Sequence, residues 1–160
     1  MDTIREINIQ DILARLAEIR VSNGYNTDVG ANVRRSRKKV DPSELPAVIV
    51  IPGTEKVTAK YGQSFCVMSV RIEGIMEFGA NDPGVVSEWI LADLKKCILA
   101  PPDPSGSPDT GWTRSPDYID GILYAEGGTE EYPDEGQSTI GAFALFDVSY
   151  TTNMNDPCGQ

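Results

Sequence analysis

The stretch FCVMSVRIEGIMEF, residues 65–78, decides the fold, because its apolar side chains recur at every second position. This period is that of a β-strand, in which successive side chains point to opposite faces of the sheet. The pattern predicts a long antiparallel strand with one buried and one wetter face, and Gly74 is expected to mark a bulge or a bend. The predicted buried face consists of Cys66, Met68, Val70, Ile72, Met76 and Phe78.

A second long strand is predicted at residues 139–152, where Ile140, Ala142, Ala144, Phe146, Val148 and Tyr150 face one way. Both long strands also carry apolar residues on their second face. Apolar groups gathered on an exposed face usually mark contacts with other molecules. We therefore expect subunit contacts at five apolar residues of the second face, namely Phe65, Val67, Ile75, Phe143 and Leu145.

Shorter strands are predicted on either side of these two. Residues 47–51, AVIVI, are continuously apolar and β-branched, which is typical of a buried strand. A short strand is expected near Val33 and another at residues 118–124. The polar residues 54–62 are predicted to be a connection, and the acidic residues 127–136 a hairpin loop or a mobile flap.

Two helices are predicted from apolar residues that recur every three or four positions. The first covers residues 6–21, and Asn23-Gly24 supplies its C-terminal stop. The second covers residues 83–98, with Asp82 as N-cap and Pro83 in the first helical position.

This order of elements predicts a single domain of the α/β (α+β) class over residues 1–152. Its sheet is largely antiparallel or mixed, and two amphipathic helices cover it. Residues 100–137 are predicted to be a long acidic loop region rich in Pro and Gly, and residues 153–160 a flexible C-terminal tail. If both helices share one face of the sheet, the other face needs solvent or another subunit.

Charge is distributed very unevenly along the chain. Residues 1–99 hold 13 acidic and 13 basic side chains, whereas residues 100–160 hold 11 acidic side chains and one basic one, Arg114. The net charge of −10 therefore comes entirely from the last third of the chain. Such a segment repels nucleic-acid phosphates. It is read either as solubilising loops or as an acidic lumen or interface formed by Glu126, Glu130, Glu131, Asp134 and Glu135.

The sequence contains none of the residue patterns that commonly support catalysis. It has no histidine, and its three cysteines, Cys66, Cys97 and Cys158, are far apart. Phosphate-loop, dinucleotide-binding and nucleophile-elbow motifs are missing, as is the EF-hand pattern. We expect a protein that is not an enzyme, with no catalytic residues, metal or cofactor. Cys66 and Cys97 are expected to be buried. With neither a membrane-length apolar run nor a signal-peptide layout, a cytoplasmic origin is expected.

The basic run RRSRKK, residues 34–39, is the most marked local feature. It is short and has no interleaved aromatic residues, so it is a weak candidate for binding nucleic acid. It is read either as a solvated loop or as a contact with the acidic third of a neighbouring subunit, in a head-to-tail ring. The candidate interface residues are Arg34, Arg35, Arg37, Lys38 and Lys39.

Several segments, in this order, resemble minor tail proteins of the bacteriophage tail-terminator type. They are NGYNTDVGANVRRSR at 23–37, DPSELPAVIVIPG at 41–53, the strand ending EFGANDPG, SEWILADLKKCI at 87–98 and FALFDVSYTTNMNDP at 143–157. The resemblance spans nearly the whole chain and rests on scaffold features. Residues 101–137 are longer and more acidic than this family pattern leads one to expect.

The resemblance implies a mixed α/β subunit of a ring, usually a hexamer, which caps the tail tube and stops its polymerisation. The implied partners are further copies of the chain, the tail tube protein and a head-completion or connector protein. DNA would pass through the ring without specific binding, and no membrane is involved. The implied location is the head-proximal end of the virion tail, assembled in the host cytoplasm. No catalytic residue is transferred.

Two other functions stay open at this stage. A connector or stopper protein of the head–tail junction would share the structural class but bind the portal side. A small ligand- or peptide-binding module would instead have a deep apolar pocket.

Overall fold

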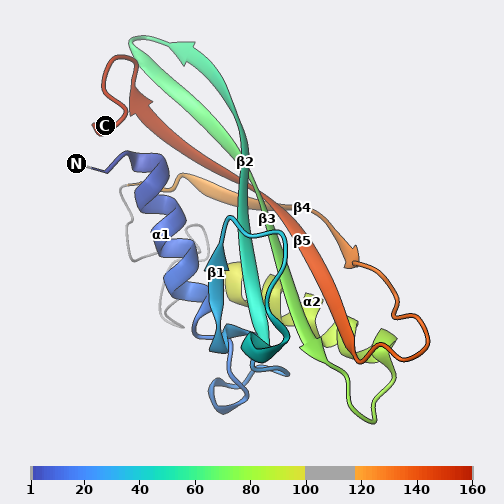
Figure 1. Ribbon diagram of the computed structural model, residues 1–160. Helices are drawn as coiled ribbons and strands as arrows, with labels where there is room; N and C mark the ends of the chain where they lie inside the picture. The colour runs from blue at the N-terminus through green and yellow to red at the C-terminus, as the bar shows by residue number, and fades with distance from the viewer. Residues whose placement is uncertain (1, 100–117, 160) are drawn as a thin grey trace.

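Two long central strands, β3 (Gln63–Glu77) and β5 (Thr139–Asn153), pair in antiparallel orientation over their whole length. The computed structural model describes residues 2–99 and 118–159. In these ranges three further strands complete a mixed sheet in the order β1-β2-β3-β5-β4 (Figure 1). They are β1 (Val33–Arg35), which runs parallel to β2 (Ala47–Lys60), and β4 (Gly121–Thr129), which runs antiparallel to β5.

Two helices begin at N-caps that the local sequence supplies. The hydroxyl of Thr3 accepts a hydrogen bond from the backbone N–H of Glu6 at the start of α1 (Ile4–Leu16). Asp82 Oδ1 accepts one from the N–H of Gly84, 2.8 Å away, at the start of α2 (Pro83–Leu99). Three 3-10 turns lie in the connections: η1 (Val21–Asn23), η2 (Val29–Ala31) and η3 (Pro42–Glu44).

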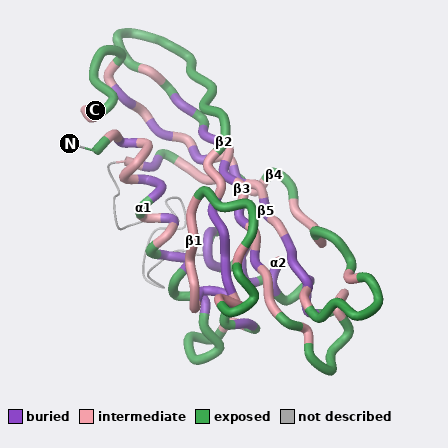
Figure 2. Tube along the Cα trace, in the orientation of Figure 1, coloured by how far each residue is buried: buried purple, intermediate pink, exposed green. Residues whose placement is uncertain are grey.

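Both helices pack on the same face of the sheet, called here the helix face; the opposite side is called the open face (Figure 1). The even-numbered side chains of β3 and β5 point to the helix face. All of them are buried except Ser64 and Met76, which are partly buried, and Figure 2 shows the buried positions along both strands. Gly74 lies in this layer, where an added Cβ would sit 2.4 Å from Cγ2 of Ile90 on α2. Close approach of α2 therefore accounts for Gly74, and the predicted bulge lies instead at Pro52/Glu55 and at Tyr124/Glu126.

The predicted fold class is confirmed: one domain contains a mixed five-stranded sheet and two helices. Both long strands and the second helix also lie where the sequence predicts them. The first helix was predicted at residues 6–21, but it begins after the N-cap Thr3 and ends at Leu16. The predicted connection at residues 54–62 was wrong, because β2 continues to Lys60. Residues 100–117 of the predicted acidic loop lie outside the described residues.

The predicted flexible tail has defined contacts in the structure. The carbonyl of Pro157 accepts a hydrogen bond from the N–H of Ile4, and the N–H of Met154 donates to the carbonyl of Gly62. The chain ends therefore lie close together, next to the hairpin that joins β2 and β3 (Figure 1).

Polar contacts fix the helices to the rest of the domain. Asp93 of α2 is buried and accepts four hydrogen bonds of 2.6–3.1 Å from the backbone and side chains of Asn26 and Thr27. Arg35 of β1 donates two hydrogen bonds, of 2.6 and 2.9 Å, to the carboxylate of Glu6 on α1. The first contact holds the loop after α1 against α2, and the second joins α1 to the edge of the sheet.

We expect Gly74→Ala to lower the free energy of unfolding by about 1–3 kcal/mol, because the new methyl group overpacks the buried contact with Ile90. Urea unfolding followed by circular dichroism measures the difference. Gly121→Ala is the matched control: it also adds a methyl group to a strand, but nothing lies within 4 Å of its Cβ position. Equal stability of the two variants would contradict the close packing of β3 against α2.

The hydrogen bonds from Arg35 hold the pKa of Glu6 below its usual 4.5, and Gln10 adds to this effect. Since the folded-state pKa is lowered, the stabilisation is present above pH 4.5 and is lost as the pH falls through the folded-state pKa. The pair is about one-third exposed, so we expect Glu6→Gln to cost about 0.5–1 kcal/mol at pH 7. Urea unfolding at pH 7 and pH 3 tests this, with Glu88→Gln as the exposed control. A cost that persists undiminished at pH 3 would rule out the charge pair as its source.

Candidate assembly surfaces

The open face of the sheet carries all five residues predicted as second-face contacts. Strand register places Ile75 opposite Gly141, Phe143 opposite Glu73, and Leu145 opposite Arg71 on this face. Their exposure differs along the strands. Ile75, Phe143 and Leu145 are partly covered, whereas Phe65 and Val67 are 43% and 38% exposed. Among these five residues, Phe65 and Val67 therefore supply the exposed apolar surface, at the end of the sheet where β2 and β3 are joined.

Arg71 occupies the middle of the open face. Its Nε donates to Glu73 and its Nη2 to Glu130, both at 2.6 Å, and its guanidinium carbon lies 4.1 Å from the ring centre of Phe143. Stacking of Arg71 on the ring explains why Phe143 is only partly exposed. The arrangement also fixes the start of the loop after β4 to the centre of the sheet.

The basic run meets acidic groups of its own chain. Besides the pair with Glu6, Arg34 lies 3.2 Å from a carboxylate oxygen of Glu44, and Arg37 lies 3.8 Å from the other oxygen of Glu44. The three arginines are thus committed to contacts inside the subunit. In the described part of the chain no ion pair involves Lys38 or Lys39. The head-to-tail contact of this run stays a prediction, and it now rests on the two lysines.

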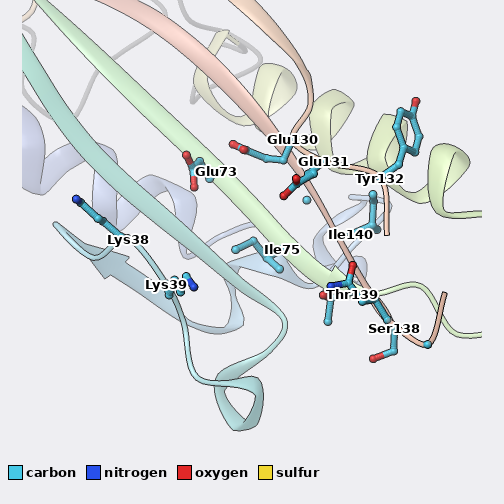
Figure 3. A pocket seen from close by; sticks show the side chains of 13 residues that line it. Lys38, Lys39, Glu73, Ile75, Glu130, Glu131, Tyr132, Ser138, Thr139 and Ile140 are labelled. Carbon is cyan, nitrogen blue, oxygen red and sulfur yellow. The ribbon is translucent and has the colours of Figure 1, made fainter. Parts of the chain in front are cut away.

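Residues 36–46 cross the open face in front of β2 (Figure 1). Together with the loop after β4 they enclose a cleft of about 570 Å³. Lys38 and Lys39 lie on one side of the cleft, and Glu73, Glu130 and Glu131 on the other (Figure 3). Basic and acidic groups therefore oppose each other within one subunit, across a space open to solvent.

Burial raises the pKa of the Glu130 carboxyl above its usual range, and the neighbouring carboxylate of Glu73 raises it further, while Arg71 opposes the shift. Two carboxylates thus share one guanidinium, so the centre of the open face carries a net negative charge when both are ionised. This electrostatic centre is built entirely from strand residues and the first residue after β4.

The other predicted acidic residues are solvent-exposed. Glu126 lies in β4 on the open face, opposite Leu145, and Glu131, Asp134 and Glu135 lie in the loop between β4 and β5. Within residues 2–99 and 118–159 no three His, Cys, Asp or Glu side chains are placed to hold a metal ion. In the same ranges no helix has both the length and the apolar character needed to cross a membrane. Cys66 and Cys97 are buried as predicted, and Cys158 is partly buried.

Sequence reasoning missed the most prominent surface feature, a hairpin formed by residues 54–66 and called here the arm. It extends past the helices, and residues 54–63 are all exposed (Figures 1 and 2). Tyr61 and Gly62 have φ of 53° and 78° and connect the paired residues Lys60 and Gln63. Positive φ at both residues is the signature of a two-residue hairpin turn, which glycine favours. Tyr61-Gly62 between alternating residues is the signal that could have revealed the arm.

A small polar cluster fixes the base of the arm to α1. Glu55 accepts a hydrogen bond from the hydroxyl of Tyr150 and lies 3.8 Å from Arg5 of α1. Arg5 also donates to the carbonyl of Gly53 at 2.7 Å. Arg5, Glu55 and Tyr150 line a cavity of about 250 Å³. Cys66 lines the same cavity, and burial raises the pKa of its thiol. The base of the arm is therefore held in place by these side chains. At its far end, Gln63–Phe65 pair with Thr151–Asn153 of β5, and the N–H of Met154 donates to the carbonyl of Gly62.

No protein-family model matches the chain, and no curated protein matches it. Among solved structures, the chain is similar to a chain described as "Virion of native gene transfer agent (GTA) particle". The two share 14% sequence identity over 93% of this chain and 92% of that chain, with a TM-score of 0.46. A similarity this distant assigns no function.

Proposed function

We propose that the protein is a structural, non-catalytic virion subunit of a phage-like particle, and specifically a tail terminator. In this role several copies form a ring, a hexamer in the usual arrangement, at the end of the tail tube. The ring stops polymerisation of the tube and provides the surface that joins the tail to the head. Its partners are further copies of the chain, the tail tube protein and a head-completion protein.

One observation carries the proposal: the sheet extends beyond the helices that cover it. The arm and the open face beside it display Phe65, Val67 and Tyr61, and Tyr61 is 91% exposed. Exposed aromatic and aliphatic side chains on a rigid strand pair are the kind of surface that other protein subunits bury. The ordered resemblance of the chain's segments to tail-terminator proteins supports the same role.

Charge supports the ring in a second way. The excess of negative charge lies in residues 100–160, and Glu131, Asp134 and Glu135 are exposed in the described loop between β4 and β5. A channel wall lined with such groups repels DNA phosphates, so that DNA slides through without sticking.

The cleft beside Lys38 and Lys39 favours assembly over a ligand-binding module. Its walls carry opposed charges, whereas sites for small molecules are lined mainly by apolar and aromatic side chains with a few polar groups. A connector or stopper would have the same structural role but would bind the portal side of the junction. Tail length separates it from a terminator, because a terminator alone limits the length of the tube.

We expect loss of this chain from particle-producing cells to yield overlong tails without heads in negative-stain electron microscopy. Complementation with Phe65→Glu and Val67→Glu together should fail, because charge on the open face blocks burial of that surface. Val85→Glu is the matched control, because it charges an exposed valine at the start of α2.

Circular dichroism of each purified variant verifies that it is folded before complementation is scored. Tails of normal length that carry no heads would transfer the role to a connector or stopper. Normal tails joined to heads in the absence of the chain would refute both structural roles.

A further inference from the structure

The sheet has two edges to which no strand of the described chain pairs. Among residues 2–99 and 118–159, β1 pairs only with Val48–Val50 of β2, so residues 54–60 of β2 have β3 on one side and no described strand on the other. At the opposite end of the sheet, the one described strand that pairs with β4 is β5. Unpaired strand edges present rows of backbone N–H and C=O groups that can pair with another chain.

The two edges belong to opposite ends of the sheet order, β2 near the first position and β4 at the last. Contact between the β2 edge of one copy and the β4 edge of the next is therefore head-to-tail. Repeated contacts of this kind close into a ring when the rotation between copies allows it. A two-fold contact would instead join each edge to a copy of itself.

The charged residues on the two edges distinguish the head-to-tail contact from the two-fold contact. The register places Lys56 opposite Val67, and Lys60 opposite Gln63, so both lysines lie on the open face of the arm. In the same way Glu126 of β4 lies on the open face, opposite Leu145. Across residues 2–99 and 118–159 none of these three side chains forms an ion pair. Lysines on an edge disfavour pairing with a second lysine-bearing edge and favour an acidic one.

Exposed apolar residues also lie on the open face at both edges. Leu123 of β4 is 70% exposed and lies on the open face, opposite Asp147. The arm carries Phe65 on its own open face, opposite Thr58. When two edges join into a continuous sheet, the open faces of both copies form one surface. Leu123 of one copy then lies on the same surface as Phe65 and Val67 of its neighbour.

We propose that the free edge of the arm, residues 54–60 of β2, pairs with β4 of the next copy, so that the sheets form one continuous ring. The open-face lysines of the arm lie beside Glu126 of that copy and set the orientation and register of the contact. The inference rests on the ring proposed above and names the surfaces that build it.

Cysteine cross-linking tests the contact. In a Cys158→Ser background, Thr58→Cys and Leu123→Cys place one thiol on the open face of each edge, while Cys66 and Cys97 stay buried. With a short bismaleimide we expect a ladder of covalent multimers. Thr58→Cys with Glu88→Cys is the matched control and should stay monomeric in a denaturing gel, because Glu88 is exposed on α2, which covers the opposite face of the sheet from Thr58 and Leu123.

Assembly of the same samples is measured in parallel by light scattering and negative-stain microscopy, on the purified full chain and on isolated tails. Rings with a ladder support the inference. Rings without a ladder overturn the edge contact and leave the ring standing. If neither the purified chain nor isolated tails contain a ring, the proposed function and this inference are both wrong.

Charge reversal provides an independent test. We expect Lys56→Glu with Lys60→Glu to weaken assembly at least tenfold, and Glu126→Lys in the same chain to restore it. The same reversal at Lys38 and Lys39 is the control that separates the arm from the basic run. If only reversal at Lys38 and Lys39 reduces assembly, the contact belongs to the basic run and the inference is wrong.

Discussion

The antiparallel pairing of β3 with β5 is the constraint on which the rest of the structure depends. Fifteen residues of each strand pair without a register shift, from Gln63 with Asn153 to Glu77 with Thr139. Because strand side chains alternate, the pairing that buries the even-numbered residues under the helices also directs every odd-numbered residue to the other face. The open face is a direct consequence of the core, and its residues cannot be buried by the same helices.

The lengths of the elements determine how much of this sheet the helices can cover. A strand rises about 3.3 Å per residue, so fifteen residues span roughly 50 Å. A helix rises about 1.5 Å per residue, so the 17 residues of α2 span roughly 26 Å. Neither helix can therefore follow a central strand from end to end. The arm is the part of the sheet that projects past them, with its base fixed by Arg5 and Glu55.

The sequence predicted the elements whose pattern is set by burial, and it failed where burial ends. In residues 65–78 and 139–152 one face is almost entirely apolar because it meets the core, and the helix at 83–98 has a recognisable N-cap. In residues 54–60 the alternation is weak, with only Val57 and Ala59 as apolar positions, because both faces of the arm are exposed. Their strand structure comes from pairing with β3, a contact that local composition does not record. The alternation of residues 65, 67, 75, 143 and 145 did place them on one face, but the cover that Arg71 gives Phe143 was not visible in the sequence.

Ion pairs inside the subunit change which basic residues are candidates for contact with another copy. In the sequence, the run at residues 34–39 is the most basic segment and therefore the first candidate for contact with an acidic neighbour. The structure places its arginines on Glu6 and Glu44, and Arg71 on Glu73 and Glu130. A guanidinium already held by a carboxylate gains little from a second partner, because leaving the first offsets the new contact. Within residues 2–99 and 118–159, several lysines form no ion pair, and two of them, Lys56 and Lys60, lie on an exposed strand with an unpaired edge. Backbone pairing and charge then act at the same place, which makes the arm a better contact with a neighbouring copy than the basic run.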